Sequence, residues 1–119
     1  MSVETTLGAC LLAWPALAGI KVRAEVAQPT DVTPYIVHTQ VTGTRVNSLR
    51  GDSGLANPHF QIDVYADTKA QATDLKKAIR LAVLANVDLG AVLIAEASGY
   101  EPDTKRYRQR QEFSFWFYD

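Results

Sequence analysis

A strictly alternating strand followed at once by a capped amphipathic helix is the feature that most constrains this sequence. In residues 60–66, FQIDVYA, apolar and polar side chains alternate, which is typical of a strand with one buried face. The next residues include Thr68 and Gln71, which form a capping box whose two side chains each satisfy a free backbone N–H. Apolar residues then recur at helical spacing over residues 68–85. The pair predicts a strand and a helix that bury their apolar faces in one core.

The remaining segments extend this pattern along the chain. The expected elements are a helix over 2–14, strands over 20–26, 35–44, 60–66, 91–97 and 105–118, and a helix over 68–85. The core-facing side chains of the strands are expected to include Ile20, Val22, Ala24, Val26, Phe60, Ile62, Val64, Ala66, Phe113, Phe115 and Phe117. This order predicts an α+β fold of two layers: a mainly antiparallel sheet of four to five strands with two helices packed on one face. At 119 residues the chain is expected to form a single domain over 1–119.

Composition limits the classes of function. The formal net charge of -1 gives no general attraction to nucleic acid or to anionic membranes. Cys10 is the only cysteine, so no disulfide forms within the chain, and its thiol is expected to be buried and inert. His38 is expected on a strand surface and His59 near a strand start. Neither has a carboxylate at ligand spacing, so no metal or cofactor is expected.

Residues 7–20 are nearly all apolar, which raises the question of a targeting segment. A secretory signal needs positive charge before its apolar core, whereas the charged residue before this run is Glu4. The run is also too short to span a bilayer. We therefore expect a core helix here and no membrane partner.

The connection between the second and third strands, residues 47–58, contains two familiar strings. RGD (residues 50–52) matches an adhesion tripeptide, and GDSG (residues 51–54) matches part of the nucleophile loop of chymotrypsin-like proteases. Three common residues in a polar loop often occur together by chance. A protease also needs a histidine base, a buried carboxylate, and a further glycine where this chain has Leu55. We therefore expect a long, exposed, glycine-containing connection.

The last strand carries a stripe of arginines. Arg106, Arg108 and Arg110 alternate, so their guanidinium groups lie on one face about 7 Å apart. Three kinds of partner are open: carboxylates of neighbouring strands, such as Glu96 or Asp63, carboxylates of another subunit, or nucleic-acid phosphate. Binding of single-stranded nucleic acid is less favoured, because no aromatic side chains alternate with the arginines on that half of the strand.

No combination of residues predicts a catalytic site. Paired carboxylates and a metal-ligand cluster are missing from the sequence pattern. The GDSG string also lacks the lysine and the following helix that a phosphate-binding loop requires. The sequence therefore favours a binding or assembly protein over an enzyme, with a small hydrolase as a minor alternative.

Three stretches, taken in order, carry a resemblance to a known family. They are PYIVHTQVTGT (34–44), NSLRGDSGLANPHFQIDVYADTKAQATDLKKAIRLAV (47–83) and GYEPDTKRYRQRQEFSFWF (99–117). Together they resemble the bacteriophage tail-completion family of long-tailed phages, which includes tail terminator and head-tail joining proteins. The resemblance covers nearly the whole chain and lies in the order and pattern of segments, with no single chemical motif.

The resemblance implies a role in virion assembly. Members of the family are small α+β subunits that form a ring, typically a hexamer, at the head-proximal end of the tail. The ring stops polymerisation of the tail tube and meets the head connector, and gene transfer agents carry similar proteins. For this chain, the implied partners are further copies of itself, the tail-tube protein and a head-side connector or stopper protein. Nucleic acid is implied at most through the lumen of the ring.

The candidate interface residues follow from the polar connection and the arginine stripe. They are Arg45, Arg50, Asp52, Leu55, Arg106, Arg108 and Arg110. The resemblance implies a place at the head-tail junction of the virion, after assembly in the host cytoplasm. The alternative function is a nucleic-acid-binding accessory protein whose arginine-rich strand face contacts phosphate, with affinity that falls steeply with salt.

Overall fold

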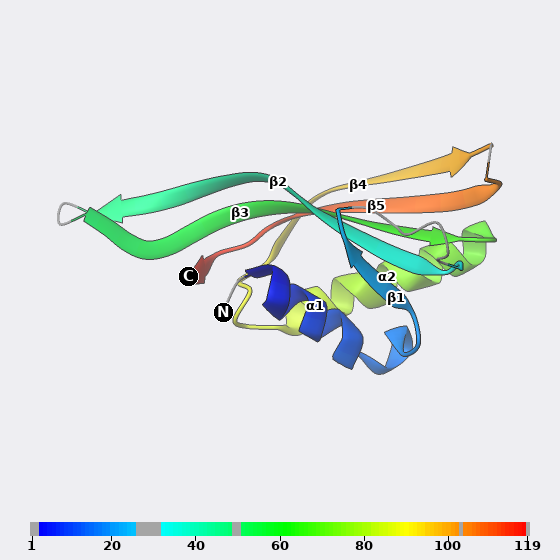
Figure 1. Cartoon of the computed structure of the whole chain (residues 1–119), viewed down its shortest axis with the longest axis horizontal. Coiled ribbons are helices and arrows are strands. Elements are labelled where there is room, and N and C mark those ends of the chain that lie inside the picture. The colour runs from blue at the N-terminus through cyan, green and yellow to red at the C-terminus, as the bar shows by residue number, and fades with distance from the viewer. Residues whose placement is uncertain (1–2, 26–31, 49–50, 103, 119) are drawn as a thin grey trace.

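The chain folds into an elongated molecule with principal dimensions of 52 × 27 × 24 Å (Figure 1). The computed structural model describes residues 3–25, 32–48, 51–102 and 104–118, and for residues 43–48, 51–54 and 118 it describes the backbone alone. The elements are α1 (Val3–Ala13), a 3₁₀ helix η1 (Pro15–Leu17), β1 (Lys21–Ala24), β2 (Tyr35–Ser48), β3 (Gly51–Ala66), α2 (Lys69–Ala85), β4 (Val92–Glu101), β5 (Arg106–Ser114) and β6 (Phe117–Tyr118).

The strands form one sheet in the order β1-β2-β3-β5-β4, and β6 pairs with the β3 segment that lies beyond the end of β5. The pairs β2–β3, β3–β5, β3–β6 and β4–β5 are antiparallel, whereas β1 and β2 are parallel. The predicted α+β fold with a mainly antiparallel sheet is therefore confirmed. The parallel pair at the edge was not predicted.

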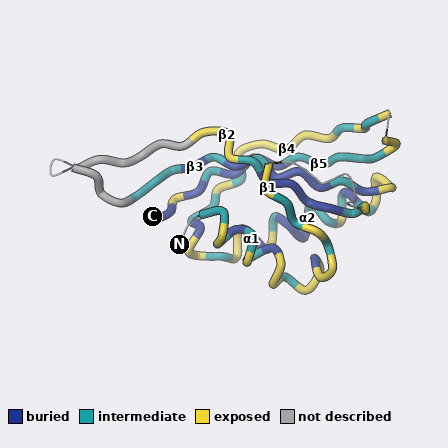
Figure 2. Tube along the Cα trace, viewed as in Figure 1, coloured by how far each residue is buried: buried dark blue, intermediate teal, exposed yellow. Residues whose placement is uncertain are grey.

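The hydrophobic core contains side chains of both helices and of the sheet. Its buried members are Leu7, Leu11, Leu17, Ile36, Phe60, Ile62, Val64, Ala78, Ile79, Ala82, Val83, Leu89, Phe113, Phe115 and Phe117. The predicted alternation in β3 is confirmed, because Phe60, Ile62, Val64 and Ala66 are at most 1% exposed. Each large apolar side chain buried in this way contributes about 1.5–3 kcal/mol relative to exposure. Figure 2 shows the buried residues concentrated where the helices meet the centre of the sheet.

Helix α2 begins and packs as its sequence predicts. Thr68 is the N-cap, and its Oγ1 accepts a hydrogen bond from the backbone N–H of Gln71 at 3.2 Å. Ile79 and Val83 are buried, whereas Lys77 is exposed. The amphipathic pattern therefore fixes which face of this helix meets the core.

The predicted connection over residues 47–58 is wrong. Strand β2 continues to Ser48 and β3 begins at Gly51, so most of this stretch belongs to an antiparallel ladder. Figure 1 shows this hairpin projecting beyond the helices. We call residues 39–48 of β2 and 51–58 of β3 the arm. The sequence did not show the arm because a backbone ladder forms without the apolar alternation that a packed strand face requires.

The first strand is shorter than predicted. Ile20 and Val22 pack partly buried against the core, as expected, but Ala24 is exposed. The strand ends because Glu25 takes a φ of 69°, and its N–H then donates to the carbonyl of His38 at 2.9 Å. Val26 lies outside the described residues.

The predicted last strand is interrupted. β5 ends at Ser114, after which the N–H of Phe115 donates to Pro58 O at 2.9 Å and that of Trp116 to Leu89 O at 3.0 Å. The chain then resumes as β6 against the base of the arm. Phe113, Phe115 and Phe117 are nevertheless all buried, as their alternation predicts.

The prediction that His38 lies on a strand surface is wrong. The imidazole is 5% exposed, lies 6.2 Å from the ring of Phe60, and has no hydrogen-bond partner for Nδ1 among the described residues. Burial lowers the pKa of His38, against smaller opposing effects of Glu4 and Glu25. The reason is the alternation of side chains along a strand: His38 lies two positions after the buried Ile36 and therefore points to the same, core side of β2.

The apolar N-terminal segment forms a helix in the core layer. The thiol of Cys10 is partly buried and donates to Ala82 O at 3.2 Å, and loss of hydration raises its pKa. Among the described helices, none combines the length and the apolar character needed to cross a membrane.

Candidate functional site on the outer face of the sheet

The face of the sheet that points away from the core carries the arginine stripe. We call this the outer face. In the strand register, Arg106 lies opposite Glu101 of β4, Arg108 opposite Tyr65 of β3, and Arg110 opposite Asp63 of β3. Gln109 and Gln111, which alternate with the arginines along β5, are buried and point to the core side, so the arginine side chains point to the other face of the sheet. The sheet register thus decides which acidic and aromatic groups the arginines meet.

Arg110 forms a two-point ion pair with Asp63. Its Nε lies 2.8 Å from Oδ1 and its Nη2 lies 3.3 Å from Oδ2. The carboxylate side chain is only 9% exposed and the arginine side chain 32% exposed. The hydrogen bond to Asp63 raises the pKa of Arg110. Cross-strand pairing with Asp63, one of the partners that the sequence left open, is therefore present within the chain.

Arg106 contacts an aromatic pair. Its Nη1 donates to the hydroxyl of Tyr35 at 2.8 Å, and its guanidinium carbon lies 5.3 Å from the centroid of that ring. Tyr35 stacks on Tyr65 with the centroids 4.9 Å apart. Burial is the main cause that raises the pKa of Tyr65. Tyr35, stacked on Tyr65, therefore holds this guanidinium.

Arg108 packs across a glycine of the neighbouring strand. A Cβ placed on Gly99 would lie 2.6 Å from Arg108 Nη2, so the absence of a side chain at that position leaves room for the guanidinium. Arg108 Nη1 lies 4.0 Å from the carboxylate of Glu101. Its buried Nε has no hydrogen-bond partner within the described chain. Arg108 is the least firmly held of the three arginines.

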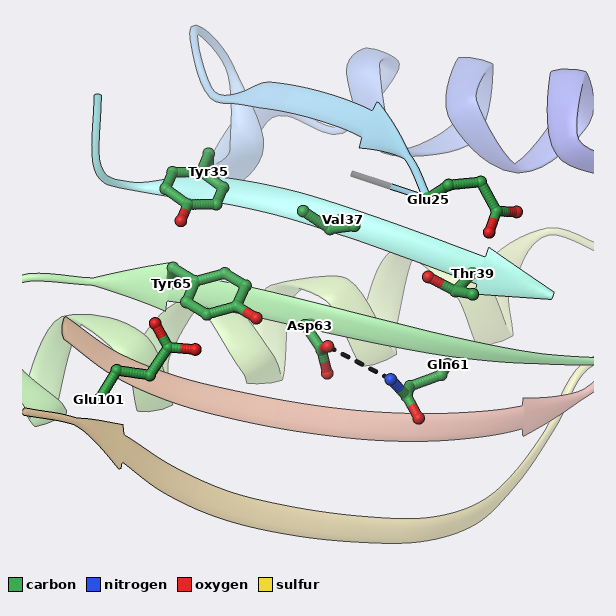
Figure 3. Close-up of a pocket in the computed structure, with 8 residues that line it drawn as sticks. All are labelled: Glu25, Tyr35, Val37, Thr39, Gln61, Asp63, Tyr65 and Glu101. Atoms are coloured by element: carbon green, nitrogen blue, oxygen red, sulfur yellow. Dashed lines mark hydrogen bonds between the residues drawn. The ribbon is translucent and has the colours of Figure 1, made fainter. Parts of the chain in front are cut away.

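A hollow of about 300 Å³ lies on the outer face (Figure 3), and two of its lining carboxylates, Asp63 and Glu101, contact Arg110 and Arg108. It is lined by Glu25, Tyr35, Val37, Thr39, Gln61, Asp63, Tyr65 and Glu101. In Figure 3 the Gln61 amide lies beside Asp63, with 3.4 Å between Nε2 and Oδ2; with the amide turned over, its oxygen accepts from Arg110 Nε at 3.2 Å and Nη2 at 3.3 Å. Within the described chain there is no group of three or more metal-ligating side chains. The hollow therefore offers carboxylates and aromatic rings for polar contacts. His38 does not line it, because its side chain faces the core.

The residues predicted from the polar connection lie at the other end of the sheet. Arg45 is opposite Ala56 and Asp52 is opposite Asn47 in the arm, and for both only the backbone is described. Arg50 lies outside the described residues. Leu55 pairs with Val46 on one side and with β6 on the other. The structure thus separates the predicted site residues into two groups, which lie towards opposite ends of the long strands (Figure 1).

Two members of the outer face were missed by sequence reasoning. Tyr35 and Tyr65 form the aromatic part of the site. The alternation of residues 60–66 predicts that Tyr65 points outward with Gln61 and Asp63, but it predicts no contact for either tyrosine. The available signal was parity, because Tyr65 falls on the same side of its strand as Asp63 and Gln61. The stacking of the two rings depends on the pairing of Tyr35 with Tyr65 across β2 and β3.

Comparison with known proteins gives one family for this arrangement. The family model described as "Tail completion protein gp17" matches residues 5–118. A search of curated proteins finds no match. The family match spans α1 to β6, and therefore includes both the arm and the outer face.

Proposed function

This chain belongs to the family of phage tail completion proteins, and on that premise we propose that it forms a ring at the head-proximal end of the tail. The ring ends polymerisation of the tail tube and joins the tail to the head. A role in tail assembly and a place in the virion follow from the family itself. The ring, its hexameric size, its place at the head-tail junction and its partners are the proposal.

The observation that carries the proposal is the shape of the subunit. A closed ring needs two different, complementary surfaces on every subunit, because each copy contacts one neighbour in front and another behind. The arm projects at one end of this subunit, and the β4–β5 hairpin with its charged outer face lies at the other (Figure 1). An elongated subunit with unlike ends supports head-to-tail association.

The arginines support a protein contact better than a nucleic-acid contact. Arg110 is paired with Asp63, and Arg106 is held by Tyr35. A phosphate would have to compete with these groups, and nearby carboxylates such as Glu101 would repel it. We therefore do not favour the nucleic-acid-binding alternative.

We also propose a structural rather than an enzymatic role. Ser53 of the protease-like string lies in β3 of the arm, whereas His38 is buried on the core side of the sheet. A serine nucleophile needs a histidine within hydrogen-bond reach. We expect a serine-reactive phosphonate to add no mass to the protein. We also expect a Ser53→Ala variant to support particle assembly, and loss of assembly would contradict this assignment.

Mass in solution tests the ring. The mass of the purified chain is measured by light scattering, alone and with the tail-tube protein of the same phage. We expect a closed oligomer of about six chains in at least one of these conditions. A strict monomer in both would contradict the proposal.

Charge reversal tests the outer face as part of the interface. Arg108→Glu is expected to lower the fraction of assembled chains, because Arg108 is the arginine with the weakest contacts inside the subunit. Lys77→Glu, the same charge change on the exposed side of α2, is the matched control and is expected to assemble normally. Thermal unfolding of both variants identifies any loss of monomer stability. Equal assembly of the two variants would exclude Arg108 from the interface.

A further inference from the structure

Two long strand edges have no partner among the described residues. β4 is the last strand of the sheet and pairs only with β5. β1 pairs with β2 from Tyr35 to His38, and from Thr39 onward no strand of the described part of the chain pairs with the second edge of β2. The third edge, that of β1, belongs to a strand of four residues. Within the described residues there are therefore two extended open edges, one on the arm and one on β4.

Open edges of this length call for a partner. Each exposes a row of backbone N–H and C=O groups that can pair with another strand, and soluble proteins usually shorten, cover or block such edges. The arm has a second need. Among the described residues, a third strand, β6, pairs only with Leu55 and Ala56 of the arm, and the rest is a two-stranded ribbon of a kind that is marginally stable in water. Addition of one strand to the arm would meet both needs.

The charges of the two edges are complementary. β4 carries Glu96 and Glu101 and no cationic residue. Each carboxylate lies 4.0 Å from a cation of its own chain, Lys76 and Arg108 respectively, and their side chains remain 36% and 38% exposed. The open part of β2 carries Arg45 and no acidic residue. Pairing β4 with β4, or arm with arm, would bring like charges together, whereas pairing β4 with the arm brings opposite charges together.

Each edge also presents one exposed apolar residue at a register shift. Val41 of the arm is 54% exposed and Ile94 of β4 is 51% exposed. Neither has a register partner in the strand next to it. A neighbouring strand would cover apolar surface at both positions.

We propose that the open edge of β2 in the arm pairs with β4 of a second copy of this chain, so that the sheet continues from subunit to subunit. The inference rests on the proposed ring and names the contact that closes it. Because the two edges differ, the contact is heterologous and can repeat around a ring, whereas an isologous contact would stop at a dimer. The β2 edge of the arm gains a neighbouring strand in the assembled state.

A photo-crosslinking experiment tests this contact. In a Cys10→Ala background, Thr42→Cys places a thiol at an exposed arm position, which is labelled with benzophenone maleimide. The labelled chain is mixed with isotopically heavy, unlabelled chain and the tail-tube protein, and is then irradiated. We expect cross-links from residue 42 to the β4 segment of the heavy chain, which shows that the contact is between subunits.

The matched control carries the same label at Leu81→Cys, a position on α2 that is 56% exposed. It is expected to give at least tenfold less cross-linking to β4. Circular dichroism and thermal unfolding confirm that both labelled chains are folded. The comparison separates a specific contact from random collision.

The outcomes distinguish the two proposals. If a ring forms but residue 42 gives no cross-links to β4, this inference is overturned and the proposed ring still stands. Cross-links from residue 42 to the tail-tube protein alone also overturn it, because they identify a different occupant of the arm. A chain that stays monomeric with the tail-tube protein overturns both proposals.

Discussion

The ion pair between Arg110 and Asp63 should lose different amounts of folding stability depending on which partner is removed. Arg110→Ala leaves a carboxylate whose side chain is 9% exposed without its two-point ion pair. Asp63→Ala leaves a guanidinium that is already 32% exposed and can turn toward water. Removing the arginine should therefore destabilise the fold more than removing the aspartate.

The magnitudes follow from the burial of the group left behind. An unpaired carboxylate at this depth costs about 3 kcal/mol, at the lower end of the range for breaking a buried pair. Loss of hydrogen bonds to a charge that can rehydrate costs about 1.5 kcal/mol. The double variant should cost about 3 kcal/mol, less than the sum of the single variants, because neither partner is then left alone.

Urea denaturation of the two single variants and the double variant at pH 7 measures these values. For a domain of this size, 1 kcal/mol corresponds to about 4 °C in Tm. The expected loss is then about 12 °C for Arg110→Ala and about 6 °C for Asp63→Ala. A coupling energy below about 0.5 kcal/mol, or a larger loss for Asp63→Ala than for Arg110→Ala, would refute the reasoning.

Three further predictions test single features of the fold. Gly90 has a φ of 52° and lies against Trp116 O, which a Cβ would approach to 2.8 Å, so Gly90→Ala should cost about 2 kcal/mol in urea denaturation. Thr68→Ala removes the N-cap bond to Gln71 and should cost about 1 kcal/mol by the same assay; no loss would mean that the cap contributes nothing. His38 has a lowered pKa in the fold, so the unfolded chain binds the proton more readily, and stability should fall as the pH drops below about 6.5. Tm measured at pH 7.5 and 5.5 should fall less for His38→Gln than for the parent chain, and an equal fall would contradict this.

The core could be predicted from the sequence because its signals are local. The alternation in residues 60–66 and the spacing in α2 each depend on neighbours within a few positions, and both patterns were confirmed by burial. The three phenylalanines near the C-terminus were placed correctly for the same reason, although the strand that carries them is interrupted. Periodic apolar side chains can be predicted to be buried without knowing which element they pack against.

The outer face could be predicted only in part. Alternation placed the three arginines on one side of a strand, and Asp63 was among the carboxylates considered as partners. The sequence could not choose between Asp63 and Glu96, since that choice depends on which strand lies beside β5 and in which register. In the structure Glu96 points to the core side and accepts a hydrogen bond from Gln111 at 3.1 Å.

The sequence by itself determined the fold class, the main strand and helix, and the apolar side chains that form the core. Only the tertiary structure decided that residues 47–58 belong largely to an arm, that His38 is buried, and that Arg110 meets a carboxylate 47 positions away in the chain. The physical reason is the range of the interactions. Periodicity reflects contacts between one element and an unspecified apolar environment, whereas strand length, register and charge pairing are set jointly by segments that are distant in sequence.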